Sequence, residues 1–153
     1  MGDEARARCQ ERARWMSALA RAEPATVTEA WEALDPRPAY RLLRPPETGL
    51  VMVRGRAGGT GAPFNLGEIT VTRCSVELDG GWVGHAYVAG RDRRHAEAAA
   101  VLDALLQDPA RRADLEAQVV GPLVAAREAR QREMRVRAAA TRVEFFTMVR
   151  GEE

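Results

Sequence analysis

The sequence predicts an α+β fold, a single domain over residues 1–153 in which helices pack on an antiparallel sheet of about three to four strands. Apolar residues recur at helical spacing toward both ends of the chain and alternate at strand spacing between them. The strand segments are joined by connections too short for a parallel crossover, which makes the sheet antiparallel. Hydrophobic residues make up 46% of the chain and charged residues 29%, as in globular proteins with a real core.

The N-terminal part predicts two helices. The first is expected over residues 4–21, with Trp15 and Leu19 on its apolar stripe, and residues 1–13 form a polar N-terminal extension of it. The second is expected to begin at Thr26, because Thr26 and Glu29 match a capping box.

The middle of the chain alternates with a period of two, which is typical of strands. The strands are expected at residues 40–44, 49–57, 66–78 and 82–89. Pro45-Pro46 is expected to separate the first two strands, and residues 79–81 to form a tight turn before the last. The apolar residues of the long third strand switch parity, which predicts a bulge or bend near Arg73.

The C-terminal half predicts helices again. Asp92 can cap a helix that runs to about residue 107 and packs on the sheet. Asp108-Pro109 is the start signal of another helix, and Gly121-Pro122 repeats it before a polar helix over residues 123–139.

Composition excludes several classes of function. All 23 basic residues are arginine and the net charge is +1, so we expect neither nucleic-acid binding nor lysine-dependent chemistry. Cys9 and Cys74 form no disulfide framework and fit no zinc motif, so no metal site is expected. The N-terminus has no signal-peptide pattern, and no apolar run is long enough to span a membrane. We therefore expect a cytoplasmic protein.

Two stretches are candidates for anion binding. The first is a glycine loop at residues 58–61, which offers bare backbone N–H groups near an arginine. Its candidate residues are Arg54, Gly58, Gly59 and Gly61. The loop joins two strands and opens no helix, so it matches neither nucleotide-binding fingerprint and also reads as an ordinary connection. The second stretch precedes and opens a helix, where guanidiniums and the helix N-terminus both attract phosphate; its candidates are Arg91, Arg93 and Arg94. Against this reading, Asp92 can already occupy the cap.

His85 and His95 are the two histidines of the chain and therefore the candidates for general acid–base catalysis. The alternative for His95 is a surface residue in a charged cluster, and for His85 a half-buried strand residue. They lie on different predicted elements, and neither a metal site nor a serine triad is well supported.

The C-terminal segment, residues 141–153, carries an apolar group after a polar helix. Its apolar side chains are Phe145, Phe146, Met148 and Val149. Such a segment either folds back onto its own core or forms an interface with a partner protein.

The chain resembles the PhnG family, the G subunit of the bacterial carbon–phosphorus lyase core complex, over nearly its whole length. The resemblance is carried by short motifs in a fixed order, each weak alone and specific together. They are residues 14–20 (RWMSALA), 47–51 (ETGLV), 58–61 (GGTG), 64–68 (FNLGE), 70–74 (TVTRC), 90–92 (GRD), 95–97 (HAE) and 145–151 (FFTMVRG).

The resemblance implies a role in phosphonate catabolism. It implies a core complex with the H, I and J subunits, two copies of each with this chain, and a functional link to the L protein. With the H, I and L proteins, the G subunit is required to transfer the ribose 5-triphosphate of ATP to a phosphonate with release of adenine. ATP is then a substrate of the complex, this chain binds no cofactor, and it acts as a subunit of the synthase that is not catalytic alone. The alternative is a purely structural subunit.

Overall fold

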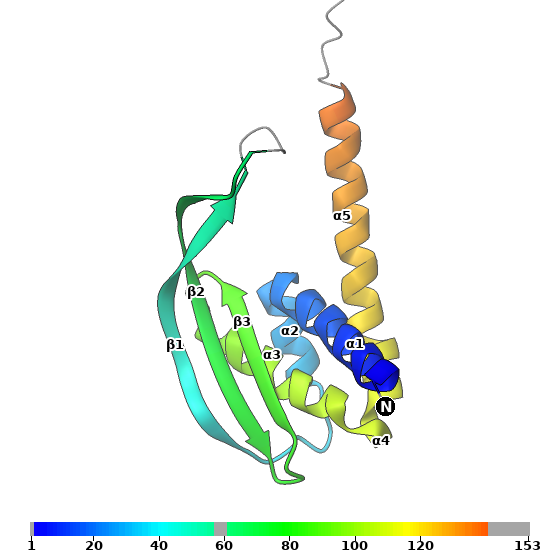
Figure 1. Ribbon diagram of the computed structural model, residues 1–153. Coiled ribbons are helices and arrows are strands. Elements are labelled where there is room, and N and C mark those ends of the chain that lie inside the picture. The colour runs from blue at the N-terminus through cyan, green and yellow to red at the C-terminus, as the bar shows by residue number, and fades with distance from the viewer. Residues whose placement is uncertain (1, 57–60, 141–153) are drawn as a thin grey trace, which may run out of the picture.

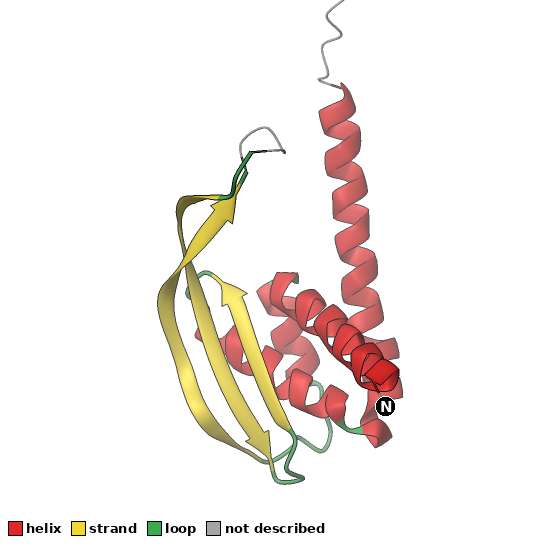
Figure 2. Cartoon of the chain, viewed as in Figure 1, coloured by secondary structure: helices red, strands yellow, loops and turns green. Residues whose placement is uncertain are grey.

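The computed structural model describes residues 2–56 and 61–140, and its elements form two layers (Figures 1 and 2). In chain order they are α1 (Gly2–Arg21), α2 (Pro24–Glu32), β1 (Tyr40–Gly55), β2 (Phe64–Leu78), β3 (Val83–Ala89), α3 (Arg93–Gln107), α4 (Pro109–Leu115), the π-helical turn η2 (Glu116–Val120) and α5 (Gly121–Ala140). The sheet is antiparallel in the order β1-β2-β3, and the helices cover one of its faces. The α+β prediction is confirmed.

Helix α3 lies at the centre of the core. It contacts β2 and β3 on one side and α1 and α2 on the other, and most of its side chains are buried. Every second residue of β2 from Thr72 to Leu78 points into this layer and is buried. Trp15, Leu19 and Val27 close the core from the side of α1 and α2.

The predicted break at Pro45-Pro46 is wrong, because both prolines lie within one continuous strand, β1. Strand β1 is an edge strand, where a proline without an N–H leaves no ladder partner unpaired. The register with β2 shifts on either side of Arg44, where the extra residues lie in β1, and again between Val53 and Arg54, where the extra residue is Leu66 of β2. The bulge expected in β2 near Arg73 is therefore also wrong, since β2 pairs with β3 without interruption. The parity switch has another origin, because Ile69 and Val71 lie on the outer face of the sheet, away from α3.

The second helix begins two residues before the predicted cap. Pro24 occupies the first turn of α2, where its fixed φ favours the helix, and Glu23 is the N-cap residue. Thr26 is therefore not the N-cap. The Thr28 hydroxyl donates to the Pro24 carbonyl at 2.8 Å, a bond within the helix and not a capping box.

The predicted caps of the later helices are confirmed. The side chain of Asp92 accepts from the His95 amide at 2.9 Å, and that of Asp108 accepts from the Ala110 amide at 3.0 Å. The start signal expected at Gly121-Pro122 is wrong, because Gly121 has helical dihedrals (φ −54°, ψ −55°), and α4, η2 and α5 follow one another without a break, with α5 beginning at Gly121 and not at residue 123. Among its side chains only Leu123 is buried, and the helix projects from the core (Figure 1).

Candidate functional site

The start of α3 carries the first predicted anion site. Asp92 occupies the cap, as the alternative reading required, and Arg94 forms an ion pair with Glu32 of α2. Arg91 and Arg93 are exposed, and the described residues offer neither of them an ion pair. Two guanidiniums therefore remain for a ligand at this helix end, and their role in anion binding stays a prediction.

His95 is buried, with 3% of its surface exposed. Its Nε2 lies 2.8 Å from the carbonyl oxygen of Leu19, so the ring ties α3 to the C-terminal end of α1. This is not the surface position that the charged neighbours suggested. A buried histidine bound to a backbone carbonyl holds two helices together and has little of its surface open to solvent.

His85 lies on the outer face of the sheet, and its Nδ1 is 2.9 Å from the hydroxyl oxygen of Ser75. Within the described ranges, no carboxylate is hydrogen-bonded to the His85 ring to orient it as in a catalytic triad. His85 is exposed and His95 is enclosed between helices, so the structure does not bring the two histidines together.

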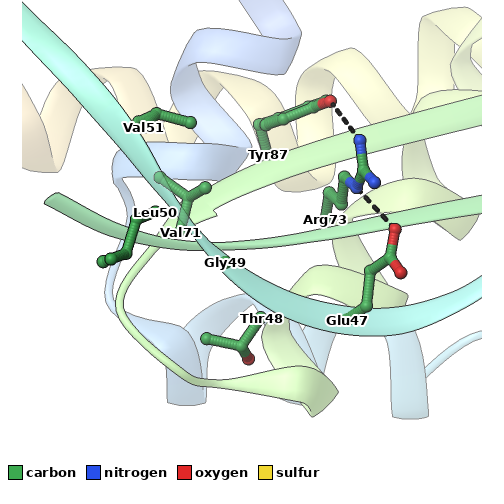
Figure 3. A pocket seen from close by; sticks show the side chains of 8 residues that line it. All are labelled: Glu47, Thr48, Gly49, Leu50, Val51, Val71, Arg73 and Tyr87. Carbon is green, nitrogen blue, oxygen red and sulfur yellow. Dashed lines mark hydrogen bonds and ion pairs between the residues drawn. The ribbon is translucent and has the colours of Figure 1, made fainter. Parts of the chain in front are cut away.

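A groove of about 280 Å³ with a charged end and an apolar end lies beside β1 (Figure 3). At its charged end Glu47 accepts from Arg44 at 2.5 Å and from Arg73 at 2.6 Å. These hydrogen bonds hold the pKa of Glu47 below its usual value. Arg73 also points toward the Tyr87 hydroxyl, 3.5 Å away. The charges of the groove thus satisfy one another across three strands, which favours recognition of a polar surface over acid–base chemistry.

Cys74 is not an activated nucleophile. Its side chain is buried on the inner face of the sheet, and burial, assisted by the charge of Glu97, raises the pKa of the thiol to about 11. Burial and a hydrogen bond of 2.7 Å to Glu97 likewise raise the pKa of Tyr40. Both groups stay protonated at neutral pH.

Strands β1 and β2 extend beyond β3 as a two-stranded hairpin (Figure 1). Its sequence-predicted residues Arg54 and Gly61 are exposed, and Gly58 and Gly59 lie outside the described residues. The glycine loop lies between β1 and β2 in the chain, as expected. Arg54 belongs to β1 and Arg91 precedes α3, so the two predicted anion sites are on different elements.

The hairpin is apolar on both faces, which the sequence analysis missed. Leu50 and Met52 lie on one face and Val51 and Ile69 on the other, and all four are exposed, Leu50 to 62%. Phe64 and Leu66 extend this surface, which we call the apolar hairpin. Residues 50–53 are four apolar residues in a row, so a strand there has apolar side chains on both faces, but a sequence does not show where the neighbouring strand ends and leaves them exposed. Exposed apolar surface of this extent marks a contact with another molecule.

Asp103 is a second residue that sequence reasoning missed. Its carboxylate is fully buried and accepts from Arg12 (2.7 and 3.2 Å), from the Trp15 indole (2.8 Å) and from the His85 amide (2.9 Å). The signal was a single acidic residue within the apolar stretch of residues 98–106. This network joins α1, β3 and α3.

The C-terminal interface candidates Phe145, Phe146, Met148 and Val149 lie outside the described residues. Among the described residues, no group of three or more histidine, cysteine or acidic side chains is placed to hold a metal ion. Within the same ranges, no helix is long and apolar enough to cross a membrane.

The fold and these surfaces define a class of protein: a small α+β chain with an open sheet face and a projecting apolar hairpin. A sequence profile described as "Phosphonate metabolism protein PhnG" matches residues 10–151. A protein of Rhizobium meliloti (strain 1021), named alpha-D-ribose 1-methylphosphonate 5-triphosphate synthase subunit PhnG, is 51% identical over 144 residues, which cover 94% of this chain and 91% of that protein. The chain belongs to the PhnG family.

Proposed function

We propose that the chain is a non-autonomous subunit of a synthase that transfers the ribose 5-triphosphate of ATP to a phosphonate and releases adenine. The observation that carries this proposal is the 51% identity, over 94% of the chain, to a protein named as a subunit of alpha-D-ribose 1-methylphosphonate 5-triphosphate synthase. Phosphonate metabolism is also the role in the description of the family.

The proposed partners are the H, I and J subunits of a carbon–phosphorus lyase core complex, two copies of each with this chain, and the L protein acts with them. ATP is a substrate of the complex, and the chain itself binds no cofactor. We place the reaction in the cytoplasm, where ATP is available.

Two structural observations favour a subunit that is inactive alone. His85 and Ser75 form a pair without an orienting carboxylate in the described residues, and the Cys74 thiol is protonated and buried. The apolar hairpin, in contrast, exposes on both of its faces side chains that need a partner. The alternative is a scaffold without a role in substrate binding, and the same hairpin is compatible with it.

The function is tested by measuring adenine release from ATP and methylphosphonate with co-expressed H, I and L proteins, with and without this chain. We expect coupled formation of the ribose 1-methylphosphonate 5-triphosphate only when the chain is present. Equal product formation without it would refute the synthase role and leave the scaffold reading.

The hairpin is expected to hold the partner. The double substitution Leu50→Ser and Ile69→Ser removes one apolar side chain from each face, and affinity for the I-type subunit should fall by on the order of tenfold or more. Folding should change little, because both side chains are already exposed. Surface plasmon resonance of the full chain against the I-type subunit measures the first effect, and thermal unfolding measures the second.

Leu43→Ser is the matched control, because Leu43 is an exposed leucine of the same strand outside the hairpin, at the register shift opposite Val76 and Ser75. It should leave the affinity within about twofold. Unchanged affinity of the double variant would show that the hairpin is not the contact.

A further inference from the structure

A cleft of about 510 Å³ lies between the junction of α1 with α2 and the exposed part of α5. Arg21, Ala22 and Glu23 line it on one side, and α5 lines the other. On α5 the lining residues recur at helical spacing, so that they share one face of the helix; they are Arg127, Arg130, Gln131, Glu133, Met134 and Arg137. None of the roles discussed above uses this cleft.

The cleft is basic. Four arginines and two glutamates line it, which leaves a formal charge of +2. Arg137 is paired with Glu133 at 2.6 Å, whereas Arg21, Arg127 and Arg130 form no ion pair with any described residue. Other exposed arginines of the described residues also lack an ion pair, so what distinguishes this cleft is that three such guanidiniums line one concave surface.

The cleft also has an apolar part. Met134 is 61% exposed and lines the cleft together with Ala22. A thioether and the stems of arginines form a surface on which a flat ring can lie. Guanidiniums bind phosphate oxygens with two hydrogen bonds each and retain their charge at all relevant pH values.

We propose that this cleft binds a 5′-triphosphate ester of a nucleoside or ribose, with Arg21, Arg127 and Arg130 on the phosphates and Met134 beside the base or sugar. This inference rests on the proposed function, in which both ATP and the ribosyl product carry a 5′-triphosphate. This cleft is a different place from the predicted anion sites at Arg91 and Arg54. If it binds the triphosphate, the helical layer of the chain contacts the substrate.

Calorimetric titration of the purified full chain tests the cleft directly, with inorganic tripolyphosphate, ATP and adenosine as probes. We expect tripolyphosphate and ATP to bind and adenosine to bind at least tenfold more weakly, with affinity that falls as salt rises. The double substitution Arg127→Gln and Arg130→Gln should weaken ATP binding by tenfold or more. Arg135→Gln is the matched control, because Arg135 is an exposed arginine of the same helix outside the cleft; its binding should stay within twofold of the native chain.

A chain that binds neither ATP nor tripolyphosphate, or a double variant that binds like the Arg135→Gln control, would overturn the proposal. The same variants in the assembled synthase separate this result from the proposed function. A raised KM for ATP with little change in kcat supports the cleft within the synthase. The opposite case is also distinguishable. If ATP binds to the free native chain but not to the double variant, while the synthase forms product without the chain, the cleft is a binding site and the synthase role is refuted.

Discussion

Gly84→Ala is expected to lower the free energy of unfolding by about 3 kcal/mol or more, a large share of the roughly 5–15 kcal/mol that holds a domain together. Gly84 is buried in β3 at the point where this strand crosses α3. A Cβ at this position would lie 1.9 Å from the carbonyl oxygen of Ala100 and 2.6 Å from the amide nitrogen of Ala104. Both atoms belong to the backbone of a helix, so no side-chain rotation can relieve the contact.

Urea unfolding of the full chain, followed by circular dichroism, measures this effect as a lower midpoint. Gly49→Ala is the matched control, because Gly49 lies in β1 of the same sheet and a Cβ there would have no atom within 4 Å. The control should change stability by no more than about 0.5 kcal/mol. If both variants unfold at the same urea concentration, the close approach of β3 to α3 is not as the structure shows.

This close approach illustrates what the sequence could and could not predict. The position of α3 followed from Asp92 and the apolar period after it, because a cap and a helical stripe are local features. No local feature marks Gly84 within its strand, because its role depends on Ala100, which is distant in the sequence. The helix after Asp92 was expected to pack on the sheet, as it does, but how closely the strand approaches it is a tertiary property.

The errors have the same origin. Pro45-Pro46 breaks a central strand but not an edge strand, and only the pairing shows that β1 is at the edge. His95 has charged sequence neighbours, yet the residue that contacts its ring is Leu19 of another helix. The exposure of the apolar hairpin was missed because four consecutive apolar residues, 50–53, are also the pattern of a strand covered on both faces.

Asp103→Asn is expected to destabilise the chain by about 3 kcal/mol, the lower end for a buried ion pair, because Asp103 is fully buried while the Arg12 side chain is 31% exposed. Every group around the carboxylate is a donor: the Arg12 guanidinium, the Trp15 indole and the His85 amide. An asparagine would turn an N–H toward at least one of them and leave Arg12 without a counter-charge. Because the network joins α1, β3 and α3, its loss should weaken all three contacts together.

A double-mutant cycle with Arg12→Gln separates the ion pair from the other bonds, because the combined loss should be smaller than the sum of the single losses. Glu128→Gln is the control, since it removes one carboxylate from an exposed ion pair with Arg132 and should cost less than about 1 kcal/mol. Urea midpoints of the four cycle members and the control give the energies. Additive losses would mean that Asp103 stabilises the fold through Trp15 and the His85 amide alone, and a native midpoint for Asp103→Asn would contradict the buried network itself.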